Sequence, residues 1–364
     1  MIHGGDIYHE HIELDFSVNV DPYGPLPEVL SAMHRAVDHV TEYPEYGAAR
    51  LRAALADALG ADERTVIPTA GASEAFLALA QAVRPRTGMV QAPSFYGYEY
   101  ALESVGAGVR KERDPYAALS AGVISGAAGS GWIPEIYAFN GVRPHMGPDL
   151  VFYGNPNNPT GLLTSKADMT ALADRCRETG SILCVDECFL VLAGAEESSL
   201  IPELKRDPER FGHVVIARSF TKTFAIPGVR LGYLACADRE LAARIRRCLP
   251  EWNISGMAQE AGLAALGTLD ETRGHVRMML AERARFAEAL AAVPSLKVFP
   301  GAANYILIEG PEDLKDRLLA KAVLIRDCGN FTGLESAPGR RHFRLAVRRP
   351  EENERLLGIL NGLC

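Results

Sequence analysis

The chain has 364 residues, of which 48% are hydrophobic and 23% are charged. This length and composition are typical of a folded globular protein of about two domains, and they argue against intrinsic disorder. Acidic residues outnumber basic ones by 46 to 38 and no Lys/Arg cluster is present, so we expect no nucleic-acid partner. The 7 cysteines include no C-x-x-C pair, which disfavours a disulfide framework and a structural zinc site; we expect no metal.

Targeting and membrane segments are also not expected. The first residues, Met-Ile-His-Gly-Gly-Asp, lack the basic and apolar regions of a signal peptide. No apolar run approaches the roughly 18 residues of a membrane-spanning helix. We therefore expect a cytoplasmic protein without membrane contact.

The N-terminal part contains a strand-like segment (11–19), a turn-rich stretch (21–27) and a periodic helix over about 28–40. A second helix is expected over 50–59, closed by Gly60. From there on, apolar runs alternate with helical patterns, one of which starts at Ser73 and another of which spans 165–179. The predicted strands are 66–70, 89–93, 149–156, 181–187, 213–220 and 232–237. This alternation predicts an α/β fold with a mainly parallel sheet flanked by helices.

After about residue 239 the pattern changes to long helices followed by short strands, which indicates a smaller α+β unit. The predicted helices are 239–248, 256–267 and 271–293. We expect a large domain over 44–238 and a small domain formed by both chain ends, 1–43 and 239–364. The Gly/Ala/Ser-rich interval 117–148 is predicted to be loop with short strands.

Lys222 lies directly after an apolar strand, among small hydroxyl residues. An isolated lysine is most often a solvated surface residue. At this position it can instead be a nucleophile of the Schiff-base type, which requires a partly desolvated amine. Ser219, Thr221 and Arg230 are placed to hold an anionic group close by.

Three further segments lie at strand ends. Asp186 closes the strand ILCV, where open α/β sheets bind ligands, although one Asp there is often a helix cap. Asn158, in NPNNPTG, offers a carboxamide at a strand end, although Asn-Pro and Thr-Gly also build turns. Gly71, Ala72 and Ser73 open a helix whose N-terminus is either an anion site or a plain cap.

With these motifs in this order, the chain closely resembles the fold-type I pyridoxal-phosphate enzymes over nearly its whole length. The resemblance implies pyridoxal 5'-phosphate as the cofactor and Lys222 as its Schiff-base lysine and proton carrier. It implies that Asp186 pairs with the pyridine nitrogen and that Asn158 binds the phenolic oxygen of the ring. The cofactor phosphate would be held by Gly71, Ala72, Ser73, Ser219, Thr221 and Arg230.

The resemblance also implies contacts beyond the cofactor phosphate. Phe95 would stack on the ring, and Tyr43 would reach the phosphate of a neighbouring subunit, so a homodimer with shared active sites is expected. Arg344 would bind the substrate carboxylate by a two-pronged contact. The chain has Phe189 where many relatives have a tyrosine that donates to the phenolic oxygen, so one donor to that oxygen is lost.

Two branches of this group are similar to the chain, the threonine-phosphate decarboxylases and the histidinol-phosphate aminotransferases. The strings DFSVNVDPYG and LIRDCGNF, together with Phe189, favour the first. That likeness implies a substrate phosphate bound by Arg326 and Asn330, a closing segment that carries His3, and further substrate contacts at Gly24 and Asn158. Without the resemblance, Arg326 is equally well explained as a surface arginine in a salt bridge. His3, so close to the start of the sequence, is equally well a solvated histidine.

The implied reaction is decarboxylation of L-threonine O-3-phosphate to (R)-1-amino-2-propanol O-2-phosphate, a step of cobalamin biosynthesis. The first alternative is an aminotransferase that acts on histidinol phosphate or another amino acid with 2-oxoglutarate. The second is a cofactor-binding protein without turnover.

Overall fold

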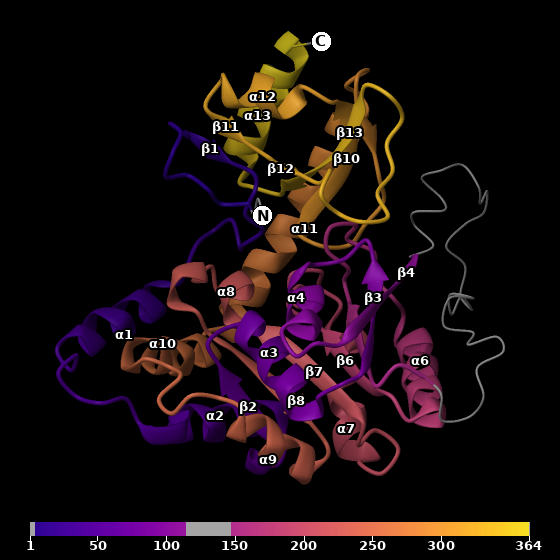
Figure 1. Cartoon of the computed structure of the whole chain (residues 1–364). Coiled ribbons are helices and arrows are strands. Elements are labelled where there is room, and N and C mark those ends of the chain that lie inside the picture. The colour runs from indigo at the N-terminus through magenta and orange to yellow at the C-terminus, as the bar shows by residue number, and fades with distance from the viewer. Residues whose placement is uncertain (1–3, 114–146, 364) are drawn as a thin grey trace.

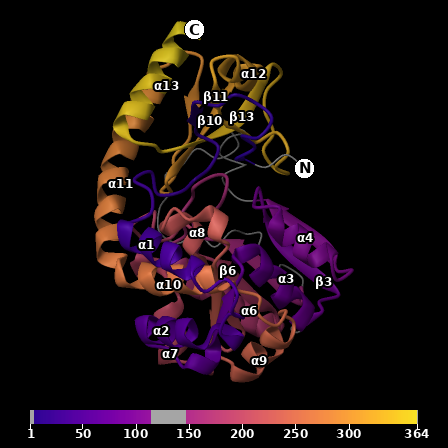
Figure 2. The ribbon, with the colours of Figure 1, turned by 90° about the vertical axis from the view of Figure 1, so that its left-hand side faces the viewer.

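The structure, a computed structural model, describes residues 4–113 and 147–363. Two bodies lie one above the other in Figure 1, and the long helix α11 (Leu269–Ala291) runs alongside both of them in Figure 2. The predicted loop 117–148 falls outside the described residues, apart from its last two. Among the described residues, no helix combines the length and apolar character needed to cross a membrane.

A seven-stranded sheet forms the centre of the lower body. In spatial order its strands are β2 (Val66–Thr69), β8 (Gly232–Cys236), β7 (Val214–Ser219), β6 (Ile182–Asp186), β5 (Leu150–Gly154), β3 (Thr87–Ala92) and β4 (Gly108–Arg113). Only β8 runs antiparallel to its neighbours, so the predicted α/β class with a mainly parallel sheet is confirmed. The sequence does not predict β4, because its charged residues are typical of an edge strand rather than a buried one.

Helices cover both faces of this sheet. They are α3 (Ala72–Val83), α4 (Gly97–Glu103), α6 (Lys166–Thr179), α7 (Ile201–Arg206), α8 (Phe220–Thr223) and α9 (Arg239–Arg247). Along β5, Leu150 and Phe152 pack in the core with α3, α4 and α9, while Val151 and Tyr153 pack with α6 and α7. Because side chains alternate along a strand, a continuous apolar run supplies both cores.

The upper body contains an antiparallel four-stranded sheet and a short parallel pair. The four strands are β12 (Arg326–Asp327), β13 (Arg340–Ala346), β10 (Tyr305–Pro311) and β9 (Lys297–Val298). The pair joins β1 (Leu14–Asp15) to β11 (Val323–Leu324). The helices here are α12 (Leu314–Leu319) and α13 (Pro350–Leu363), and residues from both chain ends share one apolar core.

Three helices of the lower body come from regions on either side of the predicted domain boundaries. They are α1 (Pro27–Val37), α2 (Ala49–Leu59) and α10 (Gly256–Gly267). Val29 of α1 and Ala258 of α10 share an apolar core with Val66 of β2. The division into 44–238 and the two chain ends stays a prediction, and this packing places α1 and α10 beside the large sheet.

We predict that Gly88→Ala in β3 destabilises the fold by about 1–3 kcal/mol, because an added methyl group overpacks the core. A Cβ at Gly88 would lie 2.3 Å from Cδ2 of Leu102, a fully buried side chain. The matched control is Gly108→Ala on the neighbouring strand β4, where the nearest contact of a Cβ would be 3.7 Å. Urea unfolding should shift the midpoint for Gly88→Ala alone; equal midpoints for the two variants would contradict the packing argument.

Candidate active site

Lys222 follows β7 in the short helix α8, whose first turn is set by the hydroxyl of Ser219. The Ser219 Oγ accepts a hydrogen bond from the Thr221 backbone N–H at 3.2 Å and lies 2.6 Å from the Thr221 hydroxyl. Burial lowers the pKa of Lys222 to about 8, and the guanidinium groups of Arg344 and Arg230 act in the same direction. Because the neutral amine is the nucleophilic and proton-accepting form, Lys222 is suited to both roles near neutral pH.

Asp186 ends β6, the strand next to β7. Its carboxylate accepts hydrogen bonds from the Tyr98 hydroxyl at 2.7 Å and from the Cys188 backbone N–H at 2.9 Å. Burial raises the pKa of Asp186, whereas these two donors lower it. Sequence reasoning misses Tyr98, because 88 residues separate it from Asp186 and no local pattern marks it.

Aromatic rings surround the Tyr98 side chain. It stacks on Phe152 with ring centroids 5.3 Å apart, and Phe95 lies against it edge-on at 5.7 Å. This packing fixes the direction of the Tyr98 hydroxyl toward Asp186, and it brings Phe95 to the same end of the sheet.

The N-terminus of α3 meets the Arg230 guanidinium. Gly71 has φ +85°, and a Cβ at this position would lie 2.7 Å from Arg230 Nη2. Arg230 also donates to the carbonyl of Pro227 at 3.1 Å. Ala72 is half-buried and Ser73 is exposed in the first turn of the helix. Free helical N–H groups beside a guanidinium form an anion site.

Two buried arginines lie opposite each other on the paired strands β12 and β13. Arg326 is 6% exposed and Arg344 is 7% exposed, and burial lowers the pKa of each guanidinium. Arg344 donates to the Asn158 side-chain oxygen and, at 2.9 Å, to the carbonyl of Ser17. Arg326 donates to the Asn330 side-chain oxygen at 2.9 Å. Like charges facing each other across a strand pair are unfavourable, so an anionic ligand would relieve this arrangement.

A cavity of about 210 Å³ next to Arg326 lies between the two bodies. Its lining includes Arg326, Asn330 and Phe331 from the upper body and Phe95, Tyr96 and Lys111 from the lower body. The expected substrate residues Arg326 and Asn330 therefore lie beside Phe95.

The remaining predicted residues do not line this cavity or lie outside the described residues. Tyr43 is 82% exposed and packs at 5.0 Å against Trp252, so one chain alone does not bring it to the site. Gly24 has φ +82° and open space around it. His3 lies outside the described residues. Phe189 packs edge-on against Tyr305 at 5.1 Å, as part of the apolar core.

These groups fit pyridoxal phosphate. An aldehyde cofactor needs an amine of lowered pKa, which Lys222 supplies. A pyridine ring that acts as an electron sink needs a carboxylate beside its nitrogen. Asp186 can supply this carboxylate, and its position is fixed by hydrogen bonds from Tyr98 and Cys188. A phosphate needs a cradle of donors, which Gly71, Arg230 and the start of α3 provide.

Comparison with known proteins agrees with this fit. The family model for aminotransferase class I and II matches residues 11–360. A threonine-phosphate decarboxylase of Salmonella typhimurium is 34% identical over 96% of this chain and 91% of its own length. A histidinol-phosphate aminotransferase of Methanothermobacter thermautotrophicus is 29% identical over 95% of this chain and 87% of its own.

Solved structures have the same architecture. The histidinol-phosphate aminotransferase of Clostridium acetobutylicum superimposes with a TM-score of 0.81 and 26% identity, covering 96% of this chain and 98% of that one. With 96% of this chain covered, the match extends over both bodies. The chain belongs to the aminotransferase class I and II family, and its cofactor is pyridoxal phosphate.

Proposed function

We propose that this enzyme decarboxylates L-threonine O-3-phosphate to (R)-1-amino-2-propanol O-2-phosphate, as a step of cobalamin biosynthesis. The observation that carries the proposal is the buried pair Arg326 and Arg344, side by side on β12 and β13. Two adjacent guanidinium groups suit a short substrate with an anion at each end, and threonine phosphate has a carboxylate and a phosphate. The 34% identity with a threonine-phosphate decarboxylase supports the same choice.

In this proposal Lys222 would bind the aldehyde of the cofactor, Asp186 would pair with the ring nitrogen, Asn158 would bind the phenolic oxygen and Phe95 would stack on the ring. The cofactor phosphate would be held by Gly71, Ala72, Ser73, Ser219, Thr221 and Arg230. When bound, pyridoxal phosphate supplies an electron sink for the pair left at the substrate Cα.

Tyr43 would complete the phosphate site of a second copy of the chain, which makes the proposed enzyme a homodimer. Its exposure of 82% leaves the side chain available for such a contact.

The protein's own groups orient the substrate and move the proton. Arg344 binds the carboxylate, with Asn158 and the segment around Gly24 beside it, while Arg326 and Asn330 bind the phosphate; His3 would close over that phosphate. Carbon dioxide then leaves from Cα. The Lys222 amine, with its pKa lowered to about 8, returns a proton to Cα.

A second candidate is an aminotransferase that acts on histidinol phosphate or another amino acid. The specific observation in its favour is the 29% identity with a histidinol-phosphate aminotransferase over 95% of the chain. In that reaction Lys222 would remove the Cα proton instead of returning one.

One assay separates the two activities. We expect purified protein with pyridoxal phosphate to release carbon dioxide from threonine phosphate without 2-oxoglutarate, and Lys222→Ala to release none. Amino transfer that depends on an oxo acid, without gas, would replace the first candidate by the second. Neither activity, together with a visible absorbance after addition of the cofactor that Lys222→Ala lacks, would favour a cofactor-binding protein without turnover. Identical absorbance of wild type and Lys222→Ala would contradict the role of Lys222 as the Schiff-base lysine.

Substitutions of Arg326 and Arg344 should affect the kinetics of phosphorylated and unphosphorylated substrates differently. We expect Arg326→Ala to raise the KM for threonine phosphate by about 10–100-fold, because a charge-assisted contact to phosphate is lost. The slow reaction of unphosphorylated threonine should change little in this variant. Arg344→Ala should impair both substrates, because both have a carboxylate. Steady-state kinetics on the two substrates test this, and equal losses for Arg326→Ala on both would contradict the assignment.

Tyr98→Phe should shift the acid limb of the activity profile. The Tyr98 hydroxyl lowers the pKa of Asp186, so its removal raises that pKa, and the ionised carboxylate is then lost at a higher pH. We expect about a tenfold loss of kcat at pH 6 and a smaller loss at pH 8. A pH profile of kcat measures the shift; an unchanged acid limb would show that the hydrogen bond does not control the ionisation of Asp186.

A further inference from the structure

Residues 16–24, here called the strap, cross from the upper body to the lower one and contact both. The Ser17 carbonyl accepts a hydrogen bond from Arg344 at 2.9 Å. With its side-chain oxygen and nitrogen exchanged, the Asn19 amide oxygen also accepts a hydrogen bond from Arg344 Nε at 2.9 Å. Further along, the backbone N–H of Asp21 donates to the carbonyl of Lys222 at 3.0 Å. The strap thus links the arginine of one body to the lysine of the other.

The Asp21 side chain anchors the strap to α11. The carboxylate is 3% exposed, and it accepts from the Tyr23 backbone N–H at 3.0 Å and lies 2.8 Å from Nδ1 of His275. Burial raises the pKa of Asp21, and the hydrogen bonds from Tyr23 and His275 oppose this effect. A buried carboxylate without such a donor is strongly unfavourable, so His275 holds Asp21 in place.

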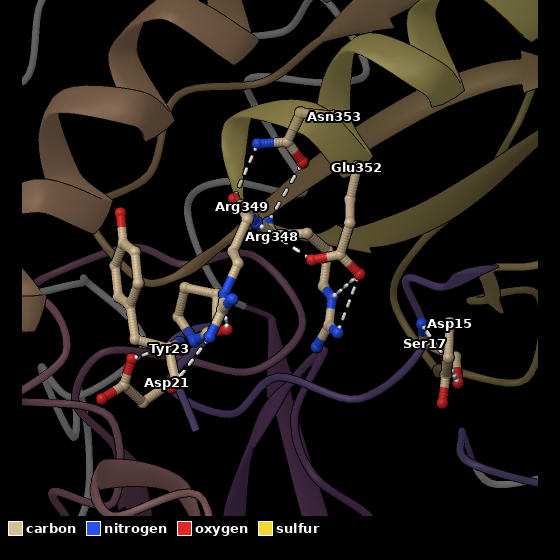
Figure 3. A network of polar contacts seen from close by, with 9 residues as sticks. Asp15, Ser17, Asp21, Tyr23, Arg348, Arg349, Glu352 and Asn353 are labelled. Carbon is tan, nitrogen blue, oxygen red and sulfur yellow. Dashed lines mark hydrogen bonds and ion pairs between the residues drawn. The ribbon is translucent and has the colours of Figure 1, made fainter. Parts of the chain in front are cut away.

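The other side of the strap is held by Arg349, at the start of α13. As Figure 3 shows, Arg349 reaches toward Tyr23 and Asp21. Its guanidinium donates to the carbonyls of Pro22 and Tyr23, both at 3.1 Å, and lies over the Tyr23 ring. The His275 ring packs on the same tyrosine, with centroids 5.1 Å apart. The middle of the strap is therefore clamped between α11 and α13.

We propose that Asp21 and His275 are positioning residues whose hydrogen bond fixes the Arg344 guanidinium relative to the Lys222 amine. Neither side chain is part of the cofactor or substrate set assigned above. They act through the strap, which contacts Arg344 at one end and the Lys222 backbone at the other. Displacement by about 1 Å within a catalytic arrangement can cost about 10²-fold in rate, so this link matters for the reaction.

The catalytic consequence rests on the proposed function. Arg344 orients the carboxylate, and Lys222 delivers or removes the proton, so their relative position decides whether the carboxylate or the Cα proton departs. A loosened strap should increase amino transfer at the expense of carbon dioxide release.

A second consequence is independent of turnover. Arg344 contributes to the lowered pKa of Lys222, so the pKa reports how closely the two groups are held. When the strap loosens, the pKa of Lys222 should rise from about 8 toward the ordinary lysine value.

The test uses four forms of the cofactor-free protein in addition to the wild type. His275→Ala removes the donor, and His275→Asn replaces it by an amide donor at a similar distance. The double variant Asp21→Leu/His275→Leu removes both polar partners without leaving a buried charge unpaired. Arg273→Ala is the matched control, because Arg273 lies on the same helix and pairs with Glu196 and Asp270 instead of the strap.

The first measurement is the rate at which an amine-reactive reagent labels Lys222 as a function of pH, read by peptide mass spectrometry. We expect His275→Ala and the double variant to raise the midpoint pH of Lys222 labelling by about one unit. For His275→Asn and Arg273→Ala this midpoint should stay within a few tenths of a pH unit of the wild-type value. Thermal denaturation should place the double variant nearer to the wild type than His275→Ala, which separates stability from positioning. An unchanged midpoint in the double variant would overturn the proposal, even if His275→Ala does not fold.

The second measurement uses the cofactor-loaded enzyme with threonine phosphate and with 2-oxoglutarate as the acceptor for amino transfer. We expect His275→Ala and the double variant to lower kcat by about 10–100-fold with a smaller effect on KM, and to raise the ratio of amino transfer to carbon dioxide release. His275→Asn should recover most of kcat. If the wild type does not act on threonine phosphate, the proposed function fails while the labelling result still decides the role of the pair. Wild-type kcat and product ratio in the double variant would count against positioning.

Discussion

The desolvation of one amine, that of Lys222, is the constraint around which the site is built. Removing an ammonium group from water favours its neutral form, and two guanidinium groups add to this effect while Asp186 opposes it. Asp186 ends β6 and Lys222 follows the neighbouring strand β7 of the large sheet, whereas Arg344 comes from the upper body. The reactivity of the lysine therefore depends on the contact between the two bodies, which neither body can reproduce alone.

The same contact explains why two arginines can be buried side by side. Arg344 donates to Asn158 from the turn after β5 of the lower body and to Ser17 from the strap, and Arg326 donates to Asn330. Arg326 also lines the cavity between the two bodies. In a chain with a net charge of −8, these local cations define an anion site that the overall charge conceals.

Apolar runs and local motifs predict much of this architecture, because buried parallel strands and strand-end residues leave local signals. The strand that ends at Asp186 and the strand that precedes Lys222 are predicted within one or two residues. Edge strand β4 lacks such a signal because its exposed face is charged. Long-range pairs leave none either: 88 residues separate Tyr98 from Asp186, and 254 separate Asp21 from His275. The pairing of Arg326 with Arg344 follows from strand register, which requires the folded sheet.

The structure also suggests where the two activities of this family diverge. Both reactions need an amine of lowered pKa and a carboxylate for the ring nitrogen, so Lys222 and Asp186 suit either one. A cation such as Arg344 can bind the carboxylate of threonine phosphate in the first reaction and that of the 2-oxoglutarate acceptor in the second. The difference lies in which bond at Cα is presented for cleavage, and that depends on small displacements of the carboxylate relative to the amine. In this chain the strap carries the contacts that set this displacement, and Asp21 and His275 hold the strap. Reaction choice is therefore expected to depend on residues that carry no chemistry of their own, while substrate choice is expected to depend on the proposed phosphate contacts of Arg326.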